Sequence, residues 1–438
     1  MGLDVDVETY LIPGFKIFEH FFTVPLDHDN PSGVKIRLFA RQGGPGFECS
    51  LPSYSGAYRA ASAKGYQWLL LDQRGTGLST PISAASLGNF ETAEAKADYL
   101  KYFRADSIVK DAELIRRELC GGRKWSLLGQ SFGGFCCINY LSLFTYHKRI
   151  FDISPNRILP VFITGGVPPL ASNPDPVYRS LYCQLIKRNS IYYLKYPKDI
   201  QRVRTILRYL STNTIILPDG GFLTPRRFRQ LGIAFGEHGG FDAIHQIVIL
   251  TANDIEAMGG LSYRCLEKIS NRQPFDSNIL YAILHEAIYC QGEKSNWSAE
   301  RNMTKDFYFS LEWLETNEGK PVLFTGEMIY SWMFDDYAEL RPLKEVAQLL
   351  AQYEDWGPLY DVEQLGKNNV PVAGVSYYED MYVDLKLSEE TVSKIKGFRH
   401  WITNEYQHNG LREGGEHILN TLFRMLRGDY DGYNESQI

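Results

Sequence analysis

A glycine-flanked serine is the residue of this chain best suited to nucleophilic chemistry. Ser131 stands in the segment 129–134, Gly-Gln-Ser-Phe-Gly-Gly, between an apolar run and a second, helix-compatible apolar run. Such a pattern is typical of a sharp turn from a strand into a helix, where glycines two positions from the serine avoid a clash. The turn would raise the Ser131 hydroxyl above a sheet and bring the backbone N–H of Phe132 near an oxyanion.

A serine hydroxyl is a weak nucleophile near neutral pH, so it needs a base whose tautomer an acid fixes. Of the nine histidines, only His408 follows the end of a predicted strand in a glycine-containing loop. Asp380 follows the strand before it, with Glu379 and Asp384 as neighbouring alternatives. We therefore expect His408 to be the base, and we favour Asp380 as the acid.

A glycine-rich loop could complete this chemistry. Residues 42–46 read Gln-Gly-Gly-Pro-Gly. Backbone N–H groups in such a loop can approach a ligand closely, so Gly43 and Gly44 could donate to the oxyanion. The alternative is that 42–46 is a plain surface turn.

The elements that must position these residues alternate between strand and helix. In the first part of the chain we expect a β-hairpin at 17–41, a strand at 67–72, a helix at 93–120, the serine turn and a strand at 157–166. In the last part we expect a strand at 370–380, a helix at 388–396 that begins at the N-cap Ser388, a strand at 398–403 and a helix at 413–427. Asp72 and Arg74 are expected to pair and brace the loop after the first strand. The alternation predicts an α/β fold with a mostly parallel sheet and helices on both faces. Residues 1–168 and 366–438 would form this core, and 169–365 an inserted, mainly helical cap.

Composition narrows the classes of function. The chain has 438 residues, 44% of them hydrophobic, which is enough for a large core. A net charge of −6 argues against nucleic acid or an anionic membrane surface as the main partner. The seven cysteines lack metal-ligand spacing, so we expect reduced thiols and no metal. No apolar run would span a membrane and no apolar signal core opens the chain, which favours a cytoplasmic location.

Five motifs together resemble those of the prolyl aminopeptidases (proline iminopeptidases), α/β-hydrolases that remove an N-terminal proline. They are QGGPG at 42–46, DQRGTGLS at 72–79, GQSFGG at 129–134, YYEDMYVD at 377–384 and NEYQHNG at 404–410. HEAIYCQG at 285–292 and GEMIYSWMF at 326–334 are similar to the cap of the larger subgroup found in bacteria and fungi.

The resemblance implies roles for the residues singled out above. Ser131 would be the nucleophile, His408 the general base and Asp380 its orienting acid, with backbone N–H groups of Phe132 and the Gly43/Gly44 loop as the oxyanion hole. No metal or organic cofactor is implied.

The resemblance also implies that carboxylates of the cap hold the free ammonium group of a peptide with N-terminal proline. Pairing with a buried carboxylate would distinguish a charged N-terminus from an internal amide. The candidates are Glu286, Glu327 and Glu237. Tyr289, Trp332 and Phe132 could form the apolar slot for the pyrrolidine ring.

One departure from the family pattern concerns the core. Arg41 directly precedes Gln42, where family members have a connecting loop and a further apolar strand. Either residues 34–40 take the place of that strand, or the sheet is incomplete. The hypotheses are a serine exopeptidase that releases N-terminal proline through an acyl-enzyme, a capped esterase or amidase, and a binding protein of the same fold that has lost activity.

Overall fold

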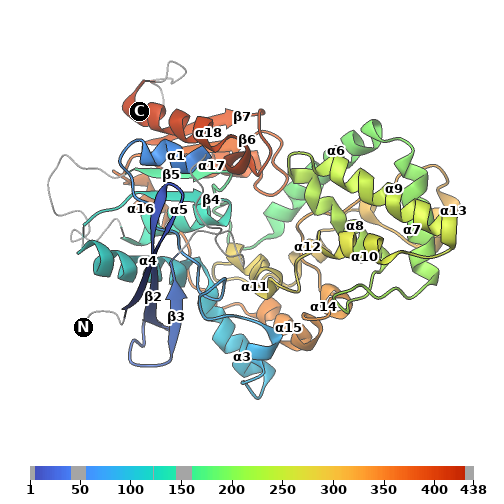
Figure 1. Cartoon of the computed structure of the whole chain (residues 1–438), viewed down its shortest axis with the longest axis horizontal. Coiled ribbons are helices and arrows are strands. Elements are labelled where there is room, and N and C mark those ends of the chain that lie inside the picture. Colours follow the sequence, from blue (N-terminus) through green and yellow to red (C-terminus); the bar gives the residue numbers. More distant parts are fainter. Residues whose placement is uncertain (1–4, 41–55, 122, 145–159, 430–438) are drawn as a thin grey trace.

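A parallel β-sheet holds the serine turn. The computed structural model describes residues 5–40, 56–121, 123–144 and 160–429 (Figure 1). The sheet strands, in the spatial order β4-β5-β6-β7, are Leu127–Gln130, Val161–Thr164, Val372–Tyr377 and Phe398–Thr403. Strands β5 and β6 are buried along their whole length, as expected for parallel strands covered on both faces. The loops that follow all four strands therefore lie at one edge of the sheet.

Helices cover both faces of this sheet. Successive side chains of a strand point to opposite faces. Helices α1 and α18 cover the face that carries Phe162 and Val375, whereas α5, backed by α4, covers the face that carries Ile163. These helices span Gly56–Ser62, Gly410–Arg427, Phe132–Phe144 and Ala105–Cys120, respectively. The α/β fold with helices on both faces is as predicted.

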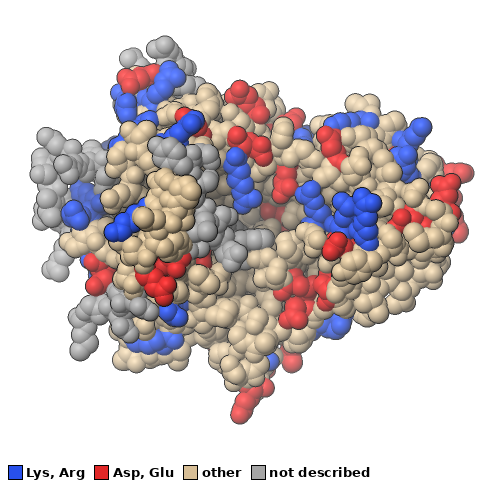
Figure 2. All heavy atoms as spheres, in the orientation of Figure 1, with Lys and Arg blue, Asp and Glu red and all other residues tan. Residues whose placement is uncertain are grey.

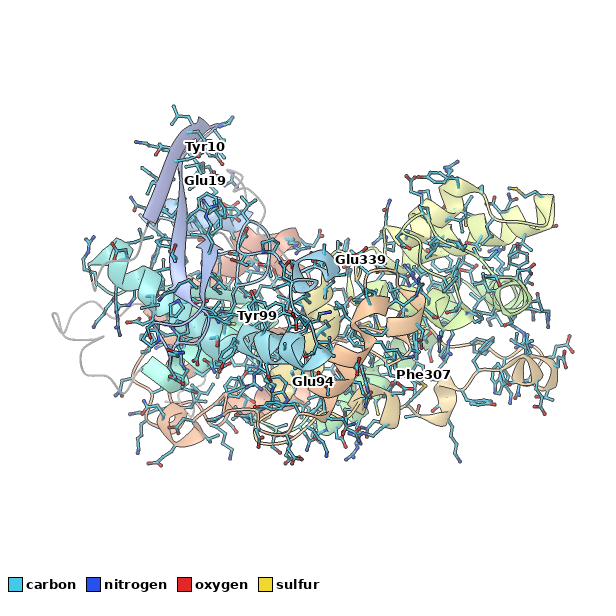
Figure 3. All side chains as sticks on the ribbon, turned by 90° about the horizontal axis from the view of Figure 1, so that it is seen from below. Tyr10, Glu19, Glu94, Tyr99, Phe307 and Glu339 are labelled. Atoms are coloured by element: carbon cyan, nitrogen blue, oxygen red, sulfur yellow. The ribbon has the colours of Figure 1, made fainter. Side chains whose placement is uncertain are left out.

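A second, antiparallel sheet precedes the parallel one. It consists of β1 (Val5–Ile12), β2 (Phe15–Pro25) and β3 (Lys35–Phe39), in that spatial order. The hairpin predicted at 17–41 is confirmed by β2 and β3, while β1 was not predicted. Figure 3 shows that the end of the β1–β2 hairpin, with Tyr10 and Glu19, projects away from the remainder of the chain.

Residues 34–40 do not replace a strand of the parallel sheet, because β3 pairs antiparallel with β2. In the described part of the chain, the parallel sheet has the four strands named above. Residues 67–72, predicted as a strand, are not assigned as one among the described residues. Leu70 and Asp72 each take part in an isolated bridge, and that of Asp72 pairs antiparallel with Phe39 of β3.

The loop after Asp72 is braced differently from the prediction. The guanidinium of Arg74 donates to both carboxylate oxygens of Asp111, at 2.6 and 2.7 Å, and to the carbonyls of Leu26 and Tyr102. Asp72 instead accepts the backbone N–H of Leu78 at 2.9 Å. A buried guanidinium needs several acceptors in a fork geometry, and Asp111 supplies the two that Asp72 does not.

The helix predicted at 93–120 is interrupted. It consists of α3 (Ala93–Leu100), the 3₁₀ helix η1 (Lys101–Phe103) and α4, separated by the extended backbone of Arg104. Helix α4 ends at Gly121, whose φ of 57° is left-handed, as a glycine stop signal predicts.

The segment 169–365 is helical. Within it, the one strand-like pairing that the structure describes is an isolated bridge between Ile216 and Phe222. Figure 1 shows α6, α7, α8, α9, α10 and α13 grouped together to one side of the parallel sheet. The helices of the segment are α6 (Asp175–Lys195), α7 (Asp199–Thr212), α8 (Pro225–Arg229), α9 (Gly240–Met258), α10 (Tyr263–Ser270), α11 (Ile279–Leu284), α12 (Ser298–Arg301), α13 (Leu311–Thr316), α14 (Met333–Asp336), α15 (Lys344–Gln352) and α16 (Val362–Gly366). Short 3₁₀ helices lie between them: η2 (Gln230–Gly236), η3 (Glu286–Tyr289), η4 (Lys305–Phe307) and η5 (Arg341–Leu343).

The helices after β6 differ slightly from prediction. Helix α17 spans Leu385–Val392, and its N-cap is Asp384, whose side chain accepts the N–H of Leu387. Ser388, the predicted cap, donates its hydroxyl to the carbonyl of Val167 instead. An aspartate four residues earlier is an equally good cap, so the helix begins there.

The surface carries charges of both signs. On the face shown in Figure 2, basic and acidic side chains are interspersed over the sheet and over the helical segment. No helix among the described residues is long and apolar enough to cross a membrane.

Candidate active site

The turn that carries Ser131 is forced by close backbone packing. Ser131 has a φ of 52°, which is uncommon for a residue with a side chain. A Cβ on Gly129 would lie 2.3 Å from the backbone of Gly133, and one on Gly166 would lie 2.2 Å from the carbonyl oxygen of Ser131. The turn is tied to β5 by the Ser131 N–H, which donates to the carbonyl of Thr164 at 3.1 Å. Strain of this kind persists only where the surroundings fix the backbone, and it clusters at active sites.

Three side chains predicted from separate segments meet above this turn. Nε2 of His408 lies 3.0 Å from Oγ of Ser131, and Nδ1 of His408 lies 2.8 Å from Oδ2 of Asp380. Asp380 is buried, and its other oxygen accepts the N–H groups of Tyr382 and Val383 at 2.8 and 3.1 Å. With Asp380 accepting from Nδ1, Nε2 is free to take the proton of Ser131. The geometry is that required for general-base activation of a serine.

The two alternative acids have other partners. Asp384 caps α17, as described above. Glu379 forms an ion pair with Arg188 at 3.1 Å. Among the three acids, Asp380 is the one that accepts a hydrogen bond from His408.

The loop of His408 is held by residues that sequence reasoning missed. Its backbone N–H donates to the carbonyl of Gly236 at 3.2 Å, and its carbonyl accepts the side-chain amide of Gln130 at 3.3 Å. The ring of Tyr382 meets the imidazole edge-on at 4.6 Å. Gly236 lies in the helical segment, about 170 positions away in the sequence, and no local pattern links it to His408.

The predicted oxyanion donors are described only in part. Phe132 is the first residue of α5, so its N–H belongs to the positive end of that helix. Gly43 and Gly44 lie outside the described residues.

Glu286 and Glu327 are both buried, but their partners differ. Glu286 accepts the N–H groups of Ser298 and Ala299 at 3.1 and 2.8 Å, and burial raises its pKa to about 7. Glu327 accepts the hydroxyl of Tyr281 at 3.2 Å. Burial, followed by the negative charge of Asp380, raises the pKa of Glu327 well above its usual range.

Tyr178 lies close enough to both carboxylates to be affected by their charges. Burial raises the pKa of its hydroxyl, and the charges of Glu286 and Glu327 raise it further. Its oxygen is buried and has no hydrogen-bond partner among the described residues. A tyrosine within a long helix gives no sequence signal of such a position. Glu237, the third candidate, has a side chain 47% exposed and lies 3.7 Å from Arg272.

Aromatic rings surround the serine turn. The ring of Tyr289 meets those of Phe135 and Tyr178 edge-on, and Phe132 lies 6.1 Å from Phe135. Trp332 stacks instead on Tyr330, and the guanidinium of Arg226 lies 4.9 Å from the centre of the Trp332 ring. The contacts therefore bring Phe132 and Tyr289 into one aromatic cluster, and those of Trp332 lie elsewhere.

A small cavity lies between Phe132 and the helical segment. Its walls are Gln73, Arg74, Thr76, Phe103, Ile108, Phe132, Leu280, Tyr281, Leu284, His285 and Ile288. His285 is buried, and neither ring nitrogen has a hydrogen-bond partner among the described residues. Burial lowers the pKa of His285 to about 4, so the ring is neutral. Its Nε2 lies 3.8 Å from Oε1 of Glu327.

The described residues also contain other side chains of the types that ligate a metal or act as thiols. Nowhere in these ranges do three His, Cys, Asp or Glu side chains gather as metal ligands. The six described cysteines are free. Burial raises the pKa of Cys290 to about 12, which keeps it a thiol rather than a nucleophilic thiolate.

The sheet, the strained serine turn and the Ser-His-Asp geometry define an α/β hydrolase. Residues 42–184 match the family described as alpha/beta hydrolase fold. The chain is 43% identical over 437 residues to a proline iminopeptidase of Aeromonas sobria, covering 95% of this chain and 98% of that protein. It is 39% identical over 434 residues to a proline iminopeptidase of Aspergillus aculeatus, covering 94% and 93%.

Among solved structures, a proline iminopeptidase-related protein of Thermus thermophilus is 13% identical, with a TM-score of 0.35 and coverage of 98% of this chain and 100% of that one. On the strength of the two full-length relatives, the chain belongs to the proline iminopeptidase family. It is a serine aminopeptidase.

Proposed function

We propose that this enzyme releases N-terminal proline from peptides through an acyl-enzyme on Ser131. The observation that carries the proposal is the hydrogen-bonded series from Oγ of Ser131 through His408 to Asp380. The names of the two full-length relatives, both proline iminopeptidases, support the choice of substrate.

In the proposed reaction, His408 takes the hydroxyl proton of Ser131 while Oγ attacks the prolyl carbonyl carbon. The N–H of Phe132 and the loop of Gly43 and Gly44 stabilise the oxyanion. His408 then gives its proton to the leaving amine, and the prolyl ester remains on Ser131. Water, deprotonated by His408, releases proline. Asp380 holds the imidazole in the required tautomer and stabilises the imidazolium.

Glu327 is our first candidate for holding the substrate ammonium group. It is buried, it lies close enough to Asp380 for that charge to raise its pKa, and one hydroxyl, that of Tyr281, donates to it. Glu286 contributes negative charge beside Tyr178, although two backbone N–H groups already occupy its oxygens. Glu237, with its exposed side chain, would act at the rim. The pyrrolidine ring would rest against Phe132 and Tyr289, with Trp332 a weaker candidate.

We further propose that residues 169–365 form a cap over the edge of the sheet and that 1–168 and 366–438 form the core. A cap would exclude water and admit only a chain end. The free cysteines favour a cytoplasmic location.

Substrate comparison tests this function. The purified enzyme is offered a prolyl arylamide, the N-acetylprolyl arylamide and short acyl esters. We expect hydrolysis of the first to exceed that of the acetylated amide by about 100-fold or more, because the acetyl group removes the ammonium charge. Faster turnover of short esters than of the prolyl amide would identify an esterase instead. A folded chain that neither turns over nor reacts with a fluorophosphonate would be the inactive binding protein.

A further inference from the structure

One guanidinium of the helical segment contacts both η2, which adjoins His408, and the turn after β6, which carries Asp380. Arg188 lies in α6 and is buried. Its Nε and Nη2 donate to the carbonyl of Phe235 at 3.0 and 2.7 Å, and its Nη1 donates to Oε2 of Glu379 at 3.1 Å. In Figure 1, α6 lies on the side of the helical segment nearest the loop after β6.

Each partner of Arg188 stands next in sequence to a residue that hydrogen-bonds to His408: Phe235 next to Gly236, and Glu379 next to Asp380. Phe235 precedes Gly236, whose carbonyl accepts the backbone N–H of His408 at 3.2 Å. Glu379 precedes Asp380, which accepts from the imidazole of His408. Arg188 therefore binds the backbone one residue before Gly236, which holds the base, and the side chain of the residue that precedes the acid.

We propose that Arg188 is a positioning residue, which clamps His408 and Asp380 in register with Ser131 from the cap. The inference rests on the proposed roles of these three residues. The hydrogen bonds of Arg188 go to Phe235 and Glu379, so it would act on the Ser131 site through these two residues.

The surroundings leave the clamp little freedom. A Cβ on Gly236 would lie 2.4 Å from the ring of Tyr382, so η2 sits directly on the loop after Asp380. The hydroxyl of Tyr382 also donates to the carbonyl of Ile233, and Asn409, next to His408, accepts the N–H of His238 at 3.1 Å. The planar fork of arginine serves one carbonyl twice and a carboxylate once, which a lysine ammonium cannot reproduce. Misplacement of a catalytic group by about 1 Å can cost about 100-fold in rate.

The test compares Arg188→Met and Arg188→Lys with Arg204→Met in the full-length enzyme. Arg204 is a matched control, because it is also buried and also donates to backbone carbonyls, those of Lys320 and Leu314. Two readouts are taken for each protein. The first is the rate at which a fluorophosphonate labels Ser131, which needs His408 but no substrate ammonium. The second is kcat and KM for a prolyl arylamide.

We expect Arg188→Met to lower the labelling rate and kcat together by about 10- to 100-fold, with KM changed by less than about 3-fold. Arg188→Lys should recover part of this loss, because it keeps the charge. Arg204→Met should lower the unfolding midpoint and leave the labelling rate at the wild-type value. A folded Arg188→Met protein that labels at the wild-type rate, or that loses activity through KM alone, overturns the proposal.

Should Arg188→Met fail to fold, Glu379→Ala decides the matter, since it removes the acceptor of the Arg188 contact at a half-exposed position. Slower labelling supports the clamp, and an unchanged rate contradicts it. Because labelling does not depend on proline recognition, a wild-type enzyme that ignores prolyl amides would refute the proposed function while the clamp is still tested.

Discussion

At the residue scale, two buried carboxylates near the serine turn have different surroundings. Asp380 accepts two backbone N–H groups and the imidazole of His408. Glu327 accepts one tyrosine hydroxyl, and burial together with the charge of Asp380 raises its pKa. A bound ammonium group would supply the positive charge that this site lacks. Glu327 is therefore suited to binding a cation, whereas Asp380 is already satisfied by the protein.

This difference predicts a pH dependence for binding an amine such as L-prolinol. Since the pKa of Glu327 is raised, the carboxyl is protonated at low pH and can pair with the ammonium only once pH exceeds that raised pKa. Affinity should therefore increase as pH rises, with Glu286 adding a step near its pKa of about 7. Above the raised pKa of Glu327, Glu327→Gln should weaken binding by about 10- to 100-fold, the value of one charged hydrogen bond.

Calorimetric titration of prolinol measures this effect. Glu312→Gln, in the first turn of α13 and exposed, serves as the control and should bind as the wild type does. Affinity that stays constant across the range, or that is unaffected by Glu327→Gln, would show that Glu327 does not hold the amine.

The sequence carried enough information to place Ser131, Asp380 and His408 because each follows a predicted strand, and the carboxyl ends of parallel strands meet at one edge. Arg188 and Tyr178 could not be found in this way. Both lie in α6, where their spacing is that of an ordinary helix, and their partners come from segments far away in the chain. Only tertiary packing brings a helical arginine to the residue beside Asp380.

At the element scale, the serine turn depends on the absence of side chains at its glycines. A methyl group on Gly129 would overlap the backbone of Gly133 at 2.3 Å, so the start of α5 must shift. We predict that Gly129→Ala lowers the free energy of unfolding by about 1–3 kcal/mol, as overpacking does, and slows fluorophosphonate labelling of Ser131.

Urea unfolding and labelling kinetics test this prediction. The control is Gly260→Ala, because a methyl group there meets nothing within 4 Å and the glycine has no positive φ. Equal stability and equal labelling for the two variants would mean that the turn tolerates a side chain at 129.

Elements were predicted well where periodicity was local. The hairpin of β2 and β3 and the parallel strands follow from apolar runs bounded by turn residues. The run at 67–72 has the same composition as a strand, but the pairing described for it consists of isolated bridge residues, Leu70 and Asp72. Whether an apolar run becomes a strand depends on a partner that composition does not reveal.

At the scale of the whole molecule, Arg104 joins helix α4 to the helical segment. It lies at the N-cap of α4 and is buried, and it donates to the carbonyls of Ala287, Cys290 and Gly357. Its guanidinium also lies 4.6 Å from the ring of Trp356. These contacts hold the end of η3, which carries Glu286 and Tyr289.

Loss of this arginine leaves the buried carbonyl of Cys290 without its donor, whereas the carbonyl of Ala287 still accepts the N–H of Cys290 and Gly357 is exposed. We predict that Arg104→Met lowers the free energy of unfolding by about 1–3 kcal/mol, the cost of an unpaired buried acceptor. Arg208→Met, at an exposed position of α7, should change it by less than about 0.5 kcal/mol. Urea denaturation of both variants gives the comparison, and a similar small change in each would show that the carbonyl of Cys290 finds another donor.

The most direct measurement of the central claim is the rate at which Ser131→Ala hydrolyses a prolyl arylamide. Ser190→Ala is the matched control, because it removes an exposed hydroxyl that donates to the carbonyl of Ile186 in its own helix. Removal of a serine nucleophile lowers kcat by about 10⁴-fold or more, so Ser131→Ala should be inactive beside a fully active Ser190→Ala. A folded Ser131→Ala enzyme that still releases proline at the wild-type rate would contradict serine catalysis.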